Sequence, residues 1–482
     1  MTLPTELSGP FDVKTSDLLQ IEPARAVELF RQLLVIEASK TGRPTTSVNV
    51  PAAINVTDGG IDAEVDFLQG ASLPAGLIAP GITRYQIKTG AFSLSTQVNV
   101  RSLLLSPKHV ATTKPKREHI QPRVLSCFEQ GGTFVVVLFG SDLVGKNDDH
   151  GKSQLVAFMT RIDPALSNIN VRVIRANQLC SAIKTLAPGI ALRLNRLGGN
   201  DDALLNDIEF LRESCDLQVD AYQPTEELDK ATIELTRITD NLSNFRHVRV
   251  LGDAGAGKTH LIFRALCAST LAGCVLYCRD PEALDGSAPL KTLVEMSKDT
   301  TIVLVADECD LETATMLANR FKRRATNMLL ITAANETEPS SAHTNVYVID
   351  VVPLAQPAVS EIFKSYGIPA ETADWLAGLC EGSPRAAHRL GAYIAAIPEQ
   401  QHAQQLAHLD RFWDLIVCSP DKPQSQDQLI PPANAHFLHH AIPGSQLEMT
   451  EGGGHLFMLS RPDAFIARLN GFLDEAVCAP AD

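Results

Sequence analysis

The chain has 482 residues, of which 45% are hydrophobic and 20% are charged. This balance is that of globular domains and excludes an intrinsically disordered chain, while the length allows about two or three domains. The formal net charge of -14 excludes general adhesion of the surface to nucleic acid, so any DNA contact requires a local basic patch or bound metal ions.

The start of the chain lacks a basic segment followed by an apolar stretch, so we expect no secretory signal. The longest apolar runs, TFVVVLF and TIVLVA, have the length of strands, and we expect no membrane contact. The cysteines are scattered and show no paired Cys-x-x-Cys with histidine partners. Together these features predict a reduced, cytoplasmic protein.

Residues 1–197 form the first predicted domain. ARAVELFRQLLVIEASK has helical spacing, whereas AEVDFL, TRYQIKT, GTFVVVLFG and VRVIRA are typical of strands. This alternation predicts an α/β domain.

Two of these strands carry residues that point to metal chemistry. Asp62 begins one strand, and Gln86 and Lys88 lie two apart in the next, so their side chains share a face. If the strands pair, Asp62 comes alongside them. A carboxylate and a neighbouring oxygen bind a hard cation such as Mg²⁺, and a lysine can orient water against a phosphodiester.

The sequence GGID followed by QIK resembles the PD-(D/E)xK restriction-endonuclease superfamily, in particular its Mrr-like branch. The resemblance implies that Asp62 is the main metal ligand, that Gln86 occupies the usual acidic position and that Lys88 is the catalytic lysine. Glutamine at that position removes one negative charge from the metal site.

A helix carboxylate often completes such a site. Glu28 and Glu37 on the preceding helix are both candidates, with Glu28 preferred as a metal ligand. Asp58 and Glu64 are further candidates.

A basic stretch, KHVATTKPKREHIQPR, follows these strands. No aromatic residues interleave there for base stacking, so the stretch is either a contact to the DNA backbone or a solvated loop. The candidate residues are Lys114, Lys116, Arg117 and Arg123.

A polar linker, RLGGNDDA, precedes a second α/β unit at residues 203–352. Its segment HVRVLGDAGAGKTHLIFRAL reads as a strand, a glycine-rich loop and a helix. Gly252, Gly255 and Gly257 let backbone N–H groups and the helix N-terminus face phosphates. Lys258 would reach the β- and γ-phosphates of ATP, and the Thr259 hydroxyl would bind Mg²⁺.

Two further strands of this unit end in polar residues. TTIVLVADE ends in Asp307, which would hold Mg²⁺ through water, and Glu308, which would polarise the attacking water. NMLLITAAN ends in Asn335, placed to touch the γ-phosphate.

The order of P-loop, Asp-Glu strand, Asn strand and GSPRAAHRL resembles the AAA+ and STAND branch of P-loop NTPases. The resemblance implies a sensor role for Asn335 at the end of the fourth core strand, and for Arg385 on a helical lid at residues 353–418. Ring ATPases of this family carry an arginine finger soon after the Asn strand. No arginine lies between Asn335 and Arg385, which favours a STAND-like switch over a hexameric motor.

The last segment, residues 419–482, resembles the closing part of an α/β-hydrolase. Asp427 matches the acid and His455 the general base. The chain contains no Gly-x-Ser-x-Gly nucleophile elbow, so a Ser-His-Asp mechanism cannot run. We interpret this segment as an orphan fragment.

The combined hypothesis is an ATP-regulated, Mg²⁺-dependent DNA endonuclease that forms a homo-oligomer on activation. A bacterial antiphage-defence role follows from the resemblance to nuclease–NTPase fusions. The alternative is an ATP-dependent sensor or scaffold whose first domain binds DNA or a partner without cleaving.

Overall fold

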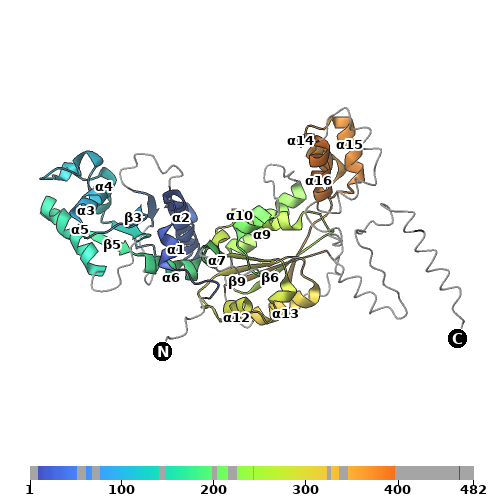
Figure 1. Ribbon diagram of the computed structural model, residues 1–482, viewed down its shortest axis with the longest axis horizontal. Helices are drawn as coiled ribbons and strands as arrows, with labels where there is room; N and C mark the ends of the chain where they lie inside the picture. The colour runs from blue at the N-terminus through green and yellow to red at the C-terminus, as the bar shows by residue number, and fades with distance from the viewer. Residues whose placement is uncertain are drawn as a thin grey trace.

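The computed structural model describes residues 9–50, 61–67, 76–140, 148–197, 204–214, 225–242, 244–322, 327–335 and 346–396, together with residue 466. Within these ranges the protein is an α/β structure with two separate sheets and three further helices (Figure 1). Asp58, Asp427 and His455 lie outside the described residues.

The first sheet is mixed and has the order β1-β2-β3-β4-β5. Its strands are β1 (Val48–Asn49), β2 (Ala63–Asp66), β3 (Ile82–Lys88), β4 (Thr133–Leu138) and β5 (Asn170–Ile174). The pairs β1–β2 and β2–β3 are antiparallel, whereas β3–β4 and β4–β5 are parallel. The strand segments expected from the sequence correspond to β2 through β5, and β1 is a short addition at the edge.

Helices cover both faces of the first sheet. They are α1 (Thr15–Leu19), α2 (Pro23–Lys40), α3 (Gln97–Leu104), α4 (Pro122–Glu129), α5 (Asp148–Ile162), α6 (Ala176–Leu186) and α7 (Pro188–Leu197). Val135 and Val137 of β4 pack in one core with α2 and α6, whereas Phe134 and Val136 pack in a second core with α3, α4 and α5. This alternation is the consequence of successive strand residues pointing to opposite faces.

The second sheet is parallel and has the order β10-β6-β9-β8-β7. Its strands are β6 (Arg246–Leu251), β7 (Val275–Cys278), β8 (Ile302–Ala306), β9 (Met328–Ala334) and β10 (Val346–Asp350). All residues of β7, β8 and β9 are buried, as expected for parallel strands covered on both faces. Strand β7 lies at the edge of the sheet, where α7 and α8 pack against it.

The flanking helices are α8 (Ile208–Ser214), α9 (Glu226–Asp240), α10 (Lys258–Ala268), α11 (Pro281–Leu284), α12 (Ala288–Glu295) and α13 (Leu311–Lys322). Figure 1 shows α9 and α10 on one face of the sheet and α12 and α13 on the other. The three helices α14 (Gln356–Ser365), α15 (Ala370–Leu379) and α16 (Pro384–Ala395) form a small lid beyond the carboxyl ends of the strands.

The two sheets share a continuous hydrophobic core. The cluster that contains Phe30 of α2 and Tyr85 of β3 continues through Ile190 of α7 to Val275 of β7. Helix α7 packs against β7 and against the 3-10 turn Ala272–Cys274 before it. The first domain is therefore packed against one edge of the second sheet.

Among the described helices, none combines the length and the apolar character needed to cross a bilayer.

Candidate functional site

The glycine-rich loop between β6 and α10 has a backbone that requires glycine. Gly252 has φ 149° and Gly255 has φ 80°, values that side-chain-bearing residues rarely adopt. A Cβ at Gly252 would lie 2.4 Å from the carbonyl oxygen of Val351, and one at Gly255 would lie 2.8 Å from Ser383 Oγ. The loop thus needs glycine both for its turn and for its close approach to the lid.

The Lys258 side chain lies in the mouth of this loop. Its ammonium donates to the carbonyl oxygens of Gly252 and Asp253 and to Asn335 Oδ1, each at 2.8 Å. Burial lowers the pKa of Lys258 below its ordinary value, while the neighbouring carboxylates, led by Asp307, oppose this shift. All three ammonium donors are therefore held by oxygens, as phosphate oxygens would hold them.

Asn335 reaches Lys258 because of the strand order. It follows β9, which lies between the P-loop strand β6 and the strand β8 that leads to Asp307. In chain order β9 is the fourth strand of this sheet.

Asp307 is the second centre of the site. Its Oδ2 accepts hydrogen bonds from the Thr259 hydroxyl and from the Tyr277 hydroxyl, both at 2.9 Å, and its Oδ1 accepts from the Glu308 N–H at 3.1 Å. The Glu308 side chain is exposed, and its backbone has φ 50°, a left-handed conformation that costs free energy in a non-glycine residue. The carboxylate beside Thr259 fits the donor set that Mg²⁺ prefers in P-loop sites.

The turn and helix that begin at Ser383 contact the glycine-rich loop directly. Ser383 Oγ donates to the Gly255 carbonyl at 3.3 Å, and the Arg385 N–H donates to the same oxygen at 3.4 Å. The positive charge of Arg385 also contributes to the lowered pKa of Lys258. The structure thus brings Lys258, Thr259, Asp307, Asn335 and Arg385 to one end of the sheet.

In the first sheet, Asp62 lies directly opposite Gln86. The ladder pairs Ala63 with Tyr85, and Asp62 N–H continues it by donating to the Tyr85 carbonyl at 2.8 Å. The Ile87 N–H donates to Asp62 Oδ2 at 2.6 Å. The carboxylate is therefore held against β3 beside the residues that the sequence singles out.

Gln86 is buried, with 4% of its surface exposed, and its side-chain oxygen Oε1 has no hydrogen-bond partner among the described residues. Lys88 lies two residues further along β3, on the same face, and is half-buried. A buried oxygen without a donor costs about 1–3 kcal/mol, a cost that a bound cation offsets. The pair of Asp62 and Gln86 therefore fits a hard cation.

The two helix carboxylates are engaged elsewhere. Glu28 is bound to Arg31 at 2.6 Å and to Gln32 at 2.9 Å, both on α2 itself. Glu37 is buried and accepts the N–H groups of Leu77 at 2.7 Å and Ile78 at 3.2 Å. No group of three or more His, Cys, Asp or Glu side chains suited to a metal was found in the part of the chain that the structure describes. The choice of a helix ligand stays a prediction.

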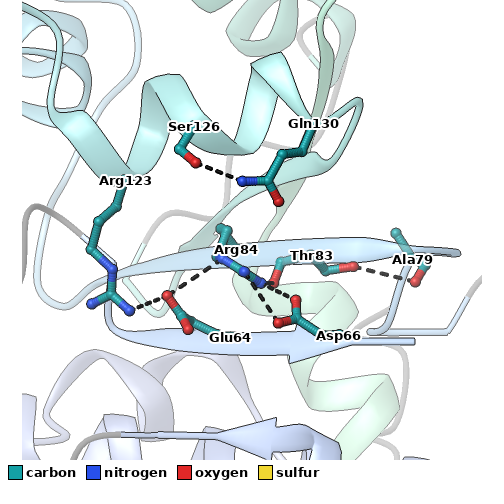
Figure 2. A network of polar contacts seen from close by, with 8 residues as sticks. All are labelled: Glu64, Asp66, Ala79, Thr83, Arg84, Arg123, Ser126 and Gln130. Carbon is teal, nitrogen blue, oxygen red and sulfur yellow. Dashed lines mark hydrogen bonds and ion pairs between the residues drawn. The ribbon is translucent and has the colours of Figure 1, made fainter. Parts of the chain in front are cut away.

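An ion-pair network continues the same face of β2 and β3 (Figure 2). Arg84 pairs with Glu64 at 3.4 Å and with Asp66, and Arg123 of α4 pairs with Glu64 from the other side. Glu64, Arg84 and Arg123 border a cavity of about 310 Å³, whose lining is completed by Pro122, Ser126, Cys127 and Gln130. Glu64, a candidate ligand by sequence, is thus held by two arginines.

The predicted DNA-contacting residues lie at the surface in different surroundings. Lys114 is exposed, and Lys116 lies 3.9 Å from Glu118. Arg117 pairs with Glu129 at 2.7 Å and with Asp163. Exposed ion pairs are weak, so a phosphate can replace these carboxylates.

Tyr277 and Ser383 also belong to this candidate site through their contacts with Asp307 and Gly255, although no sequence motif singles them out. Tyr277 lies near the end of a strand beside the Asp307 strand, which is the signal that could have indicated it.

No family model matches the sequence. Uncharacterized proteins of Mycobacterium bovis and Mycobacterium tuberculosis are 40% identical over 58 residues, which is 12% of this chain and 17% of each relative. The chain thus spans less than a fifth of the length of these curated relatives. The structure of C. elegans PCH-2 shares 14% identity with a TM-score of 0.24, and the match covers 39% of this chain and 66% of that one.

Proposed function

We propose that this protein is an ATP-regulated, Mg²⁺-dependent DNA endonuclease. The observation that carries the proposal is the position of Asp62 opposite Gln86, whose buried oxygen lacks a hydrogen-bond donor among the described residues, with Lys88 on the same face. A bacterial antiphage-defence role and assembly of the active form from several copies are parts of the same proposal.

In the first domain, Asp62 and Gln86 would hold Mg²⁺, and bound Mg²⁺ supplies the positive charge that stabilises a phosphodiester under attack. Lys88 would orient the attacking water and stabilise charge on the scissile phosphate. The Ile87 N–H fixes the direction of the Asp62 carboxylate. Lys114, Lys116, Arg117 and Arg123 would contact the DNA backbone.

In the second domain, the loop N–H groups and Lys258 would hold the phosphates of ATP, and Thr259 with Asp307 would hold its Mg²⁺. Glu308 would orient the attacking water, while Asn335 and Arg385 would contact the γ-phosphate. Because Lys258 is already bonded to Asn335, a nucleotide that takes over the ammonium also releases this amide. Nucleotide binding would thereby change the contacts between the glycine-rich loop and the end of β9.

A second function is favoured by one specific observation. Glutamine at position 86 removes a negative charge, and no group of three acidic, His or Cys ligands was found among the described residues. A first domain that binds DNA or a partner without cutting, under control of the nucleotide site, would have these features.

Nicking of supercoiled plasmid with Mg²⁺ distinguishes the two functions. We expect the wild type to nick and Lys88→Ala to be slower by about a hundredfold or more, because it loses the group that acts on water and phosphate. Lys184→Ala is the matched control and should nick at nearly the normal rate, because this exposed lysine lies on α6, which packs on the face of the sheet opposite Gln86 and Lys88. Absence of nicking by the wild type, or an unaffected Lys88→Ala, would reject cleavage, and DNA binding would then test the scaffold.

A further inference from the structure

Tyr277 connects the nucleotide site to its surroundings through its hydroxyl. The residue lies on β7, at the edge of the second sheet, and 2% of its surface is exposed. Its hydroxyl donates to Asp307 Oδ2 at 2.9 Å, and this oxygen also accepts the Thr259 hydroxyl. A buried phenol needs an acceptor, so the tyrosine ring and the carboxylate constrain each other's position.

The backbone of Tyr277 connects it to the first domain. Its N–H donates to the Asn206 carbonyl at 2.7 Å, and the Asn206 N–H donates to the Tyr277 carbonyl at 2.8 Å. Arg196, in the last turn of α7, donates to Asn206 Oδ1 at 2.7 Å. One short path therefore runs from Asp307 through Tyr277 and Asn206 to the final helix of the first domain.

We propose that Tyr277 is a positioning residue of the nucleotide site and that it couples Mg²⁺–ATP at Asp307 to helix α7. The inference rests on the proposed binding of ATP at the P-loop. If the Asp307 carboxylate turns to share a metal ion with Thr259, the Tyr277 hydroxyl keeps its hydrogen bond to Asp307 only if the tyrosine ring or strand β7 moves with the carboxylate. Because the strand is paired with Asn206, that movement is transmitted to the segment bound to α7. The coupling free energy is the difference between the hydrogen-bonded arrangements with and without Mg²⁺–ATP, and such a difference between two sites defines allostery.

The variant Tyr277→Phe tests the positioning role, because it keeps the ring and removes the hydroxyl. ATP affinity is measured with and without Mg²⁺. We expect unchanged affinity without Mg²⁺ and an Mg²⁺-dependent gain reduced by about three- to tenfold, the effect of one lost hydrogen bond. Tyr347→Phe, on strand β10 at the opposite edge of the sheet, is the matched control and should keep the full gain.

The coupling has its own readout in hydrogen exchange of α7. Mg²⁺–ATP should change exchange in α7 of the wild type, and this change should be largely lost in Tyr277→Phe. Asn206→Ala removes the acceptor for Arg196 but keeps the backbone pairing, so it should retain Mg²⁺-dependent ATP affinity while losing the response in α7.

An undiminished Mg²⁺-dependent gain in Tyr277→Phe would overturn the positioning role, and a full α7 response in both variants would overturn the coupling. Failure of the underlying ATP site gives a different result, in which the wild type binds ATP no better than Lys258→Ala.

Discussion

The two sheets of this protein hold their candidate sites in different states of hydrogen bonding. At the second sheet the polar groups satisfy one another, since Lys258 donates to three oxygens and Asp307 accepts three hydrogen bonds. At the first sheet, Gln86 Oε1 has no donor among the described residues. A site whose polar groups bond one another must break those hydrogen bonds to bind a ligand, so it can act as a switch. A buried oxygen without a donor favours a cation without breaking any internal hydrogen bond.

The largest effect that tests this comparison is expected for Lys258→Ala. The change removes a buried ammonium whose donors would pass to phosphate oxygens, so ATP affinity should fall by about a hundredfold or more. Calorimetric titration with ATP measures it. Lys364→Ala, an exposed lid lysine paired with Glu361, is the control and should bind ATP normally. Equal ATP affinity of the wild type and Lys258→Ala would refute the P-loop assignment.

The next largest effect is expected in the ion-pair network of Figure 2, which lies beside Asp62 and Gln86. Arg84→Met removes the only arginine that pairs with both Glu64 and Asp66 in the network of Figure 2, so the free energy of unfolding should fall by about 2 kcal/mol. Arg123 has 40% of its side chain exposed where it pairs with Glu64, so Arg123→Met should cost less than about 1 kcal/mol. Urea unfolding compares the two, and an equal loss would show that the network does not hold β2 against β3.

A smaller effect is expected when a negative charge is introduced at position 86, beside Asp62. Gln86→Glu places a carboxylate in a buried position, so the metal-free variant should melt at a lower temperature than the wild type. Added Mg²⁺ should restore several degrees and stabilise the variant more than it stabilises the wild type. Thermal unfolding with and without Mg²⁺ measures both. If Mg²⁺ raises the melting temperature of Gln86→Leu as much as that of Gln86→Glu, the cation binds elsewhere.

The smallest effect is a difference between Glu37 and Glu28 in how their contributions to stability depend on pH. Burial raises the pKa of Glu37 above its ordinary value of 4.5, so its contribution to stability is fully present below that pH and is lost as pH rises through the native pKa. The hydrogen bond from Arg31 lowers the pKa of Glu28, so its contribution is present above the ordinary value and is lost as pH falls through the native pKa.

Melting temperatures of Glu37→Gln and Glu28→Gln are compared with the wild type between about pH 3 and pH 7. The difference should change with pH above the ordinary value for Glu37 and below it for Glu28, with slopes of opposite sign. Slopes of the same sign would contradict the burial of Glu37. Plasmid nicking by the same two variants decides which carboxylate, if either, serves the metal.

The parts of the molecule that could be predicted from sequence are those whose signal is local. The glycine-rich loop at residues 252–257 follows a strand and precedes a helix, and the period of two in β3 places Gln86 and Lys88 on one face. The α/β class follows from the same alternation. These features depend on neighbours in sequence, and the structure has them at the expected positions.

The contacts that sequence could not indicate join distant segments. Asn206 pairs with Tyr277, Tyr277 reaches Asp307, and Ser383 reaches Gly255 across 128 positions. In the sequence Glu37 reads as a free helix carboxylate, whereas in the structure it accepts a hydrogen bond from the N–H of Leu77. Such contacts depend on packing of the whole chain, which no local period encodes.

The most direct test of the central claim is DNA cleavage with Mg²⁺, in the presence and absence of ATP, by the wild type, Lys88→Ala and Lys258→Ala. If this claim holds, the wild type cleaves in an ATP-dependent manner, Lys88→Ala loses cleavage under either condition, and Lys258→Ala no longer responds to ATP. ATP binding by the wild type without any DNA cleavage, or cleavage that persists in Lys88→Ala, would contradict it.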